Sequence, residues 1–284
     1  MLASQGAAAH LRVLGPADLP AALTVLGQDP VVNVFAEYRA RLTSLDPRWL
    51  GGEMWGYDVD GALRSLCHVG ANLVPVTATR EAATAFARRA LSAGRSSSTI
   101  VGPRRAVEWM WAELEGEWGR PRDERWDQPH LVTSRCSDVV PDAAVRRTPV
   151  SLVDALYPAC VAMYTEEVGV NPEQDGGGGL YRARVAQLVR RGWSFSRIED
   201  DRVLFKAEVA CVTESAAQIQ GVYVDPSVRG QGLATRGMAA VVEQVLRDLA
   251  PTVSLYVNAH NVPARRAYER VGFEQTETFA TLMF

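Results

Sequence analysis

The chain has 284 residues, which exceeds the usual size of one domain and suits two domains of about 100 to 200 residues each. Hydrophobic residues make up 47% of the chain and charged residues 22%, which excludes a fibrous or globally disordered class. The formal net charge of −3 gives no general attraction to nucleic acid or to anionic lipid, so we expect no nucleic-acid partner and no membrane partner.

Cysteine spacing and the distribution of apolar residues narrow the class further. The 4 cysteines lie far apart, and no pair has metal-ligand spacing or a flanking histidine cluster. We therefore expect reduced thiols and no metal. Met1 to His10 lack the basic start and the long apolar stretch of a signal peptide, and no window has the apolar length that spans a bilayer. These features predict a cytoplasmic protein.

The first half of the chain alternates between strand and helix patterns. Strands are expected at Leu11–Leu14, within Met54–Val76 and at Ser98–Val101, and helices at Val32–Leu42, Glu81–Leu91 and Ala106–Leu114. A polar stretch around Pro141 follows, and its composition suits a crossing between domains. We therefore predict an α/β domain over residues 1–140 and a second domain over residues 141–284.

The second domain begins with a helix pattern at Leu152–Glu167 and continues with three short strands. Trp193–Ile198, Val203–Thr213 and Ala217–Val224 are rich in apolar residues and are separated by turn residues, so we expect an antiparallel meander. Four consecutive glycines, Gly176–Gly179, predict a loop before this meander.

A glycine-rich turn joins the last of these strands to a long amphipathic helix. The turn reads Arg229-Gly230-Gln231-Gly232-Leu233-Ala234. The first N–H groups of a helix have no intrahelical partner and the helix dipole adds positive charge, so the turn predicts a pyrophosphate site. An ordinary tight strand-to-helix turn is the alternative. A P-loop is excluded because no Lys-Ser or Lys-Thr follows, and the dinucleotide fingerprint is excluded because its third glycine is missing.

A second motif lies one strand further along the chain. Val253–Asn258 is expected to be a strand, and a helix pattern follows it before Gly272-Phe273. Helical spacing places Asn261, Ala264 and Tyr268 on one face of this helix.

The glycine turn, followed at this spacing by Asn261, Ala264 and Tyr268, resembles the GNAT superfamily of N-acetyltransferases over about residues 143–284. The resemblance implies an α/β (α+β) fold in which a mixed, mainly antiparallel, splayed sheet is flanked by helices. Residues 1–140 have a similar α/β order without a phosphate turn, so we expect a degenerate GNAT-like copy and a tandem arrangement. A structural domain that binds a partner is the alternative for this half.

The resemblance also implies acetyl-coenzyme A as cosubstrate. Its pyrophosphate would bind at Arg229, Gly230, Gln231, Gly232, Leu233 and Ala234, and its pantetheine arm would pair with Val222, Tyr223 and Val224 as an added strand. Asn258 and Asn261, with Ala264 on the same helix face as Asn261, would hydrogen-bond the pantetheine amides. A helix cap is the second interpretation of Asn261.

The implied reaction is direct attack of a primary amine on the acetyl carbonyl through a tetrahedral intermediate. A backbone N–H near Tyr223 would stabilise the oxyanion, and Tyr268 would be the general acid, since a phenol with a pKa of about 10 keeps its proton at neutral pH. Family members often carry a glutamate near the start of the strand that leads to the phosphate turn, and here Ala216 and Ala217 occupy that stretch. Glu208 and Glu214 are the candidate bases, and a solvated strand carboxylate is the other interpretation of each.

The sequence thus predicts an acetyl-coenzyme A-dependent N-acetyltransferase whose acceptor is an amine of a small molecule or of a protein. A sensor that binds acyl-coenzyme A without catalysis is the alternative, and the missing strand glutamate is compatible with it. The helices and loops from about Leu152 to Arg191 would select the acceptor, and their residues carry no transferable code for its identity.

Overall fold

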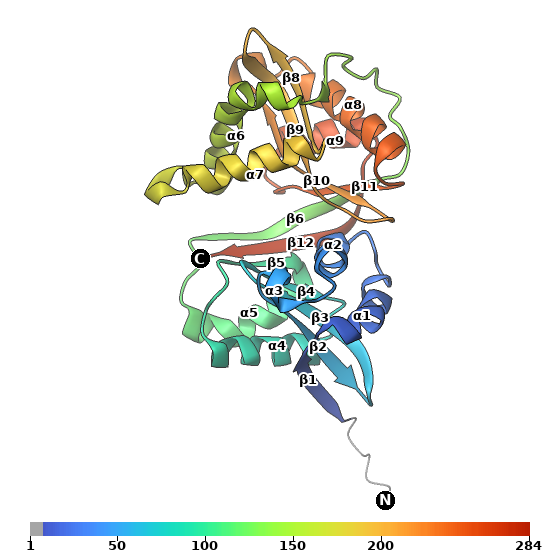
Figure 1. Ribbon diagram of the computed structural model, residues 1–284, viewed down its shortest axis with the longest axis vertical. Coiled ribbons are helices and arrows are strands. Elements are labelled where there is room, and N and C mark those ends of the chain that lie inside the picture. The colour runs from blue at the N-terminus through green and yellow to red at the C-terminus, as the bar shows by residue number, and fades with distance from the viewer. Residues whose placement is uncertain (1–7) are drawn as a thin grey trace, which may run out of the picture. The chain divides into compact units, whose positions relative to one another are not determined.

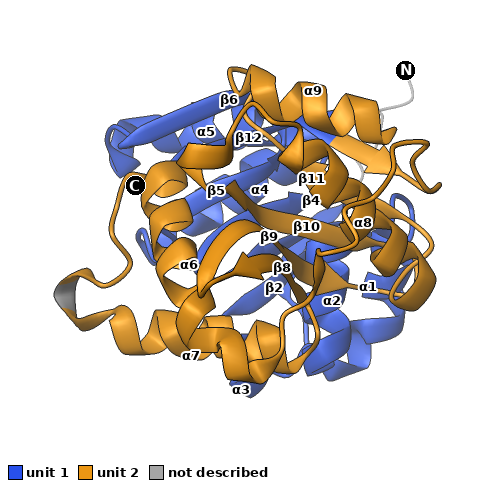
Figure 2. Ribbon diagram, turned by 90° about the horizontal axis from the view of Figure 1, so that it is seen from above, with its two compact units in different colours: residues 1–130, 276–284 blue, residues 131–275 orange. Residues whose placement is uncertain are grey.

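The computed structural model describes residues 8–284, so residues 1–7, which belong to the segment predicted to lack a signal peptide, lie outside the described residues. The chain divides into two compact units, which Figure 2 shows in different colours. Unit 1 comprises residues 1–130 and 276–284, and unit 2 comprises residues 131–275. Within the described range, no helix is both long enough and apolar enough to cross a membrane.

Unit 1 is an α/β unit whose strands follow the order β1-β2-β3-β4-β5-β12-β6 (Figure 1). Its strands are β1 (Ala9–Val13), β2 (Glu53–Val59), β3 (Ala62–Val69), β4 (Asn72–Val76), β5 (Thr99–Pro103), most of β6 (Asp123–Thr133) and most of β12 (Glu274–Met283). Its helices are α1 (Leu19–Leu26), α2 (Val34–Thr43), α3 (Pro47–Leu50), α4 (Arg80–Ala93) and α5 (Arg104–Trp118). The strands and helices predicted for residues 11–114 are all present, whereas β6 and β12 were not predicted.

The last strand of the chain returns to unit 1. β12 runs antiparallel to β5, with Phe279 opposite Pro103, and lies next to β6 on its other side. Ala280 and Leu282 are fully buried in the core of unit 1. Because these apolar residues pack there, the units divide after residues 130 and 275, where a single boundary near Pro141 was expected.

Unit 2 has the strand order β11-β10-β9-β8-β7. Its strands are β7 (Arg146–Arg147), β8 (Ser194–Glu199), β9 (Arg202–Val212), β10 (Ala217–Val224) and β11 (Val253–Tyr256), and its helices are α6 (Val153–Val168), α7 (Gly178–Arg190), α8 (Leu233–Asp248) and α9 (Val262–Val271). The predicted antiparallel meander is confirmed as β8, β9 and β10. Two of the four consecutive glycines, Gly178 and Gly179, form the start of α7 and not a loop.

The two units repeat one order of elements. In each unit an edge strand is followed by helices, three antiparallel strands, a helix, a strand parallel to the preceding one, and another helix. The parallel pair is β4 and β5 in unit 1 and β10 and β11 in unit 2, and each pair is joined at only two register positions. This repetition supports an origin of the units by duplication.

The strand β9 lies between two layers of helices in unit 2, as Figure 2 shows, and its side chains alternate between the two layers. Phe205, Ala207 and Val209 pack in the core that includes α8 and α9. Lys206 and Glu208, which alternate with them, point to the opposite face, where α6 lies. Gly237 of α8 lies so close to Phe205 that an added Cβ would stand 2.7 Å from its ring.

This close approach of α8 to the sheet yields a stability prediction. Gly237→Ala should lower the free energy of unfolding by about 1 to 3 kcal/mol, because overpacking forces the helix away from Phe205. Gly116→Ala is the matched control, since Gly116 is an exposed residue within α5 whose added Cβ meets nothing within 4 Å. The control should stabilise the protein by about 0.5 to 1 kcal/mol through helix propensity. Thermal and denaturant unfolding of both variants measures the difference, and equal stability of the two would contradict it.

Candidate active site

The sheet of unit 2 opens between two neighbouring parallel strands. β10 pairs with β11 at Ala217 opposite Val253 and at Gln218 opposite Ser254, and their register ends there. The remainder of β10, Ile219 to Val224, pairs only with β9 among the described residues. One edge of this segment therefore leaves backbone N–H and C=O groups without a neighbouring strand, which is where a ligand can add as a strand.

A β-bulge lies in the segment of β10 that faces this opening. Its register with β9 shifts between Gln220 and Tyr223, and Gly221 adopts a φ of +61°, which favours glycine. Beyond the bulge, the Asp225 N–H donates to the Leu204 carbonyl of β9 over 3.0 Å. Strand alternation then directs the N–H and C=O groups of Val224 to the open edge.

A buried polar cluster lies on the α6 side of the bulge. Lys206 Nζ donates to Glu208 Oε1 over 2.6 Å and to the Gly221 carbonyl over 2.9 Å. The Cys160 thiol of α6 donates to the same Glu208 oxygen over 3.6 Å. Burial is the largest single influence and lowers the pKa of Lys206, but the attraction to and hydrogen bonds with Glu208 and Cys160 together outweigh it, so the pKa of Lys206 lies above its ordinary value and the nitrogen is an ammonium. The predicted site residue Glu208 thus lies at the bulge.

The turn after β10 is fixed by its own side chains before the glycines begin. Asp225 accepts from the Ser227 N–H and binds the Arg202 guanidinium at 2.6 and 2.9 Å. The hydrogen bond from Arg202 has the largest effect, and together with the Ser227 contacts it holds the pKa of Asp225 far below its usual range. This carboxylate therefore stays ionised. Gly230 and Gly232 then take left-handed φ values of +78° and +75°, which explains why glycine stands at both positions.

The glycines deliver the chain to the start of α8. Gly232 is the N-cap, and no side chain caps the helix. Leu233 is buried in the core, whereas Ala234 is half-buried. No acidic residue stands in the first turn. The first N–H groups therefore meet no carboxylate of their own turn, and this helix start suits an anion such as a pyrophosphate.

Arg229 supports the turn from the side. Its guanidinium forms a bidentate pair with Glu166 of α6 at 2.7 and 2.9 Å, and its Nε donates to the Val224 carbonyl over 3.0 Å. The same group lies 5.8 Å from the ring centre of Tyr223. Arg229 thus ties the end of β10 to the last turn of α6.

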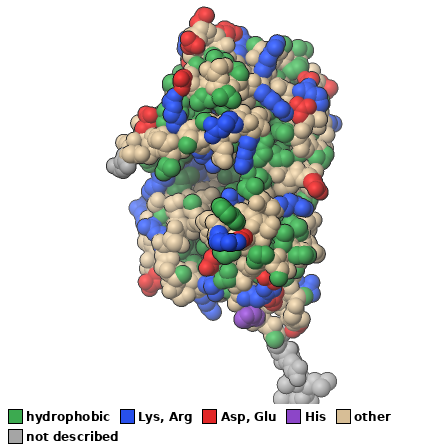
Figure 3. All heavy atoms as spheres, in the orientation of Figure 1, with side chains coloured by type: hydrophobic (Ala, Val, Ile, Leu, Met, Phe, Trp, Pro, Cys, Tyr) green, Lys and Arg blue, Asp and Glu red, His purple; other side chains and the backbone are tan. Residues whose placement is uncertain are grey.

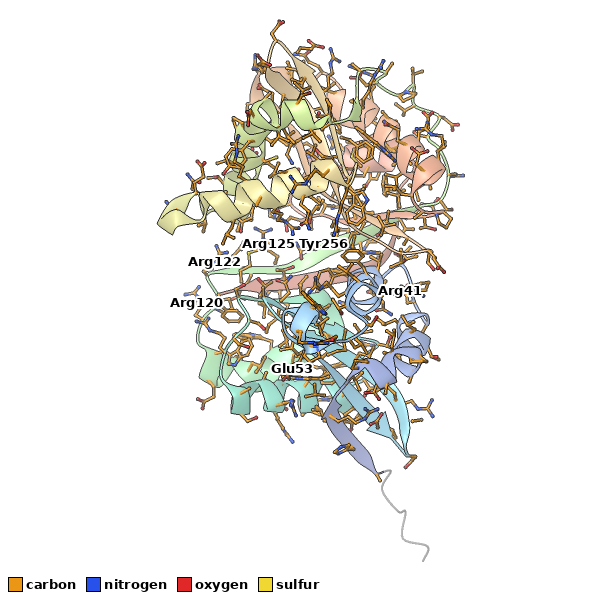
Figure 4. All side chains as sticks on the ribbon, in the orientation of Figure 1. Arg41, Glu53, Arg120, Arg122, Arg125 and Tyr256 are labelled. Atoms are coloured by element: carbon orange, nitrogen blue, oxygen red, sulfur yellow. The ribbon has the colours of Figure 1, made fainter. Side chains whose placement is uncertain are left out.

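The other wall of the opening contains the predicted asparagines. The side-chain amide of Asn258 donates to Glu167 of α6 over 3.3 Å. Asn261 is the N-cap of α9, and its side-chain oxygen accepts from the Ala264 N–H, so the capping interpretation of Asn261 is confirmed. Tyr256, the last residue of β11, is labelled in Figure 4 and is 38% exposed.

Tyr268 of α9 packs edge-on against Phe273, with ring centres 5.9 Å apart, and is only 6% exposed. Burial, with a smaller contribution from Glu167, raises the pKa of Tyr268 well above its ordinary value. The phenol is therefore protonated throughout the neutral range and can donate a proton.

Glu214 is not brought to this site. It is exposed in the turn between β9 and β10, at the end where β10 still pairs with β11. It lies seven residues before Gly221, which is roughly 20 Å along an extended strand. Of the two predicted carboxylates, only Glu208 lies at the bulge.

Unit 1 lacks these features at its equivalent strand-to-helix turn. The Thr79 side chain caps α4 by accepting from the Ala82 N–H, and Glu81 stands in the first turn. Gly102 of β5 approaches Pro75 of β4, with 3.4 Å from an added Cβ to the ring. At the start of α4, the oxygen atoms of the Thr79 and Glu81 side chains therefore stand where α8 has no such groups.

Two groups of residues escaped sequence reasoning. Glu166 and Glu167 follow each other at the end of α6, and one contacts each wall of the opening. Lys206 stands two residues before Glu208 on a largely apolar strand, and this spacing could have indicated a paired buried charge. Among residues 8–174 and 176–284, no group of three or more His, Cys, Asp or Glu could hold a metal ion.

A mixed sheet opens beside a bulge, next to an uncapped helix start after a glycine turn, and this is the order of features in which the sequence resembles the GNAT superfamily. Residues 192–273 match the acetyltransferase (GNAT) family, and the C-terminal half of the chain is a GNAT acetyltransferase domain. Residues 52–156 match a domain of unknown function, DUF4081. The predicted resemblance is confirmed.

Two curated relatives share parts of this sequence. A mycothiol acetyltransferase of Brachybacterium faecium is 37% identical over 125 residues, which are 41% of this chain and 37% of that protein. A mycothiol acetyltransferase of Mycobacterium leprae is 46% identical over 55 residues, 18% of each chain. The shared segments therefore span well under half of either relative.

Solved structures share the fold over nearly the whole chain. A tandem GNAT protein from the clavulanic acid biosynthesis pathway has a TM-score of 0.55 at 14% identity, covering 97% of this chain and 98% of that one. A GCN5-related N-acetyltransferase from Sphaerobacter thermophilus has a TM-score of 0.58 at 16% identity, covering 97% and 95%. The predicted tandem GNAT-like architecture is confirmed at the level of the fold.

The start of α8, whose first turn has no acidic residue, gives a binding prediction. Ala234→Asp should weaken coenzyme A binding by more than tenfold, because a carboxylate in the first turn repels a pyrophosphate. It should not lower the melting temperature, since an acidic residue stabilises a helix start. The matched control is Glu81→Ala, because Glu81 is the second residue of α4 and Ala234 is the second residue of α8. This control should leave the affinity for coenzyme A unchanged. Calorimetric titration should also give one coenzyme per chain; two per chain would contradict the assignment to unit 2 alone.

Proposed function

We propose that this chain is an acetyl-coenzyme A-dependent N-acetyltransferase with its active site in unit 2. The observation that carries the proposal is the opening between β10 and β11, which lies directly before the uncapped start of α8. A pantetheine arm can extend the sheet along the open edge of Val222 to Val224, where the Val224 carbonyl also accepts from Arg229, while the pyrophosphate meets the helix N–H groups. The residues present therefore fit acetyl-coenzyme A as a substrate.

We assign the protons of the reaction to two residues. The amine nitrogen forms a C–N bond to the acetyl carbonyl carbon and loses a proton to Glu208. The tetrahedral intermediate then collapses, the C–S bond breaks, and Tyr268 gives its proton to the departing sulfur. Glu208 Oε2 suits this role because it would lie 3.2 Å from a Cβ added to Gly221, beside the bulge, whereas Oε1 is bound by Lys206. A backbone N–H of the bulge faces the position where negative charge develops on the carbonyl oxygen.

The acceptor is proposed to reach the site past α6 and α7. Tyr164 and Tyr181, whose ring centres lie 5.3 Å apart, line this side together with Cys160, whose backbone carbonyl accepts from the Tyr181 hydroxyl over 2.9 Å. The names of the relatives favour a small-molecule acceptor of the kind that mycothiol acetyltransferases use. The test of activity is to mix the protein with acetyl-coenzyme A and one acceptor at a time and to measure the release of coenzyme A thiol. The acceptors are that of the mycothiol acetyltransferases, simple primary amines and lysine peptides. Tight acetyl-coenzyme A binding without turnover on any amine would favour a sensor.

Replacing the proposed acid should separate catalysis from binding. Tyr268→Phe should lower kcat by about 10²- to 10⁴-fold, because the departing sulfur loses its proton donor. Coenzyme A affinity should change little, because the ring still packs on Phe273. The measurements are steady-state kinetics and calorimetric titration, and full activity of the folded variant would remove Tyr268 from the mechanism.

The two predicted carboxylates can be separated in the same way. Glu208→Gln should lower kcat by at least about 10²-fold while acetyl-coenzyme A still binds. Glu214→Gln is the matched control and should keep near-full activity, since Glu214 is exposed away from the bulge. Thermal unfolding checks that Glu208→Gln folds without the Lys206 ion pair. A larger loss in Glu214→Gln than in Glu208→Gln would reverse the assignment.

A further inference from the structure

The Lys206 side chain is fully buried, with 0% of it exposed. A buried ammonium is costly unless it is paired, and its partners here are Glu208 Oε1 at 2.6 Å and the Gly221 carbonyl at 2.9 Å. A well-packed apolar pair of similar volume is often as stable as a buried ion pair. Stability of the ion pair alone therefore does not account for a buried lysine here. The second partner, a backbone carbonyl of the bulge, links Lys206 to the conformation of β10.

The other titratable groups facing Lys206 are neutral. Burial raises the pKa of the Cys160 thiol to about 12, so Cys160 is a thiol at neutral pH. Burial likewise raises the pKa of Tyr181 on α7 far above its ordinary value. The ammonium and the Glu208 carboxylate thus form the one charged pair among the residues named in this cluster, and the ammonium is free to polarise the Gly221 carbonyl.

The contact with Gly221 also fixes a direction. In a trans peptide the carbonyl of one residue and the N–H of the next point to opposite sides. Because the Gly221 carbonyl is turned to Lys206 Nζ on the α6 side of β9, the Val222 N–H points away from that nitrogen. Val222 lies two residues before Val224, so strand alternation places its N–H at the edge of β10 that has separated from β11.

We propose that Lys206 is a positioning residue for acetyl transfer: its ammonium holds the Gly221 carbonyl and so directs and polarises the Val222 N–H toward the opening between β10 and β11. This inference rests on the proposed function, because it needs a thioester carbonyl in that opening. Hydrogen bonds in series strengthen one another, perhaps by about 10 to 30% per bond, so a charged donor on the carbonyl makes the N–H a better donor.

The inference has a spectroscopic test that needs neither an acceptor amine nor a base. Acetyl-coenzyme A labelled with ¹³C at the acetyl carbonyl is bound to the wild type, and the carbonyl stretch is recorded by isotope-edited infrared spectroscopy. A polarised N–H should shift this band to lower frequency on binding. In Lys206→Met the shift should be lost, while the affinity for unacetylated coenzyme A should change by less than about threefold, a small difference in free energy.

A second variant guards against misfolding. Lys206→Met leaves Glu208 buried without its partner, whereas the double variant Lys206→Met/Glu208→Gln removes both charges and should fold more readily. The double variant should also lack the shift. Arg147→Met is the control, since it breaks the exposed pair with Asp248 at 3.1 Å and should keep the shift.

The kinetic readout separates a positioning role from a purely structural one. In Lys206→Met, kcat should fall by about 10- to 100-fold, less than the 10²- to 10³-fold that removal of a direct oxyanion donor costs, while the KM for acetyl-coenzyme A stays nearly constant. A full infrared shift in either folded Lys206 variant overturns the inference. Binding of acetyl-coenzyme A to the wild type without a shift overturns it while leaving the proposed function intact, and absence of binding to the wild type overturns the proposed function itself.

Discussion

The separation of β10 from β11 after two paired positions is the constraint on which the site of unit 2 depends. Backbone polar groups in a sheet need partners, and a central strand that loses its neighbour leaves a row of them exposed along one edge. The bulge at Gly221 keeps β10 bound to β9 while it bends the strand at the opening. The same strand then runs into the glycine turn, so the open edge and the start of α8 are adjacent in the chain by necessity.

Contacts from α6 hold the two walls of this opening. Glu166 binds Arg229 after β10, and Glu167 binds Asn258 after β11, so the last turn of one helix contacts both. On the surface, basic and acidic side chains are interspersed over the face that Figure 3 shows, in keeping with a net charge of −3. The affinity that we propose for a phosphate-bearing substrate therefore rests on the local geometry of the helix start and not on the net charge of the chain.

Local sequence patterns were sufficient for the elements that local physics determines. The glycine turn was recognisable because left-handed φ values at Gly230 and Gly232 demand glycine, and Asn261 was recognisable as a cap. The strand β6 was missed because it is rich in charged residues and contains Pro129, both of which are unusual in a strand. Its place beside β12 is a tertiary pairing that no window of the sequence contains.

The candidate bases show the same limit at the level of one side chain. Glu208 and Glu214 looked alike in sequence, since both lie near the strand that leads to the turn. What distinguishes them is the bulge opposite Glu208 and the helix α6 that covers it, and both are contacts between distant segments.

Comparison of the two units indicates which features are needed for a site and which only for the fold. Unit 1 keeps the strand order and the short parallel register between β4 and β5, so these features can persist without a ligand. What differs is the chemistry at the helix start: Thr79 and Glu81 supply oxygen atoms of their own, whereas the start of α8 has neither a side-chain cap nor an acidic residue in its first turn. A helix start that caps itself gains local stability, and one that remains uncapped forgoes it. The uncapped turn of α8 is therefore the feature that distinguishes unit 2 from unit 1, and it is the one to which our proposal assigns the pyrophosphate.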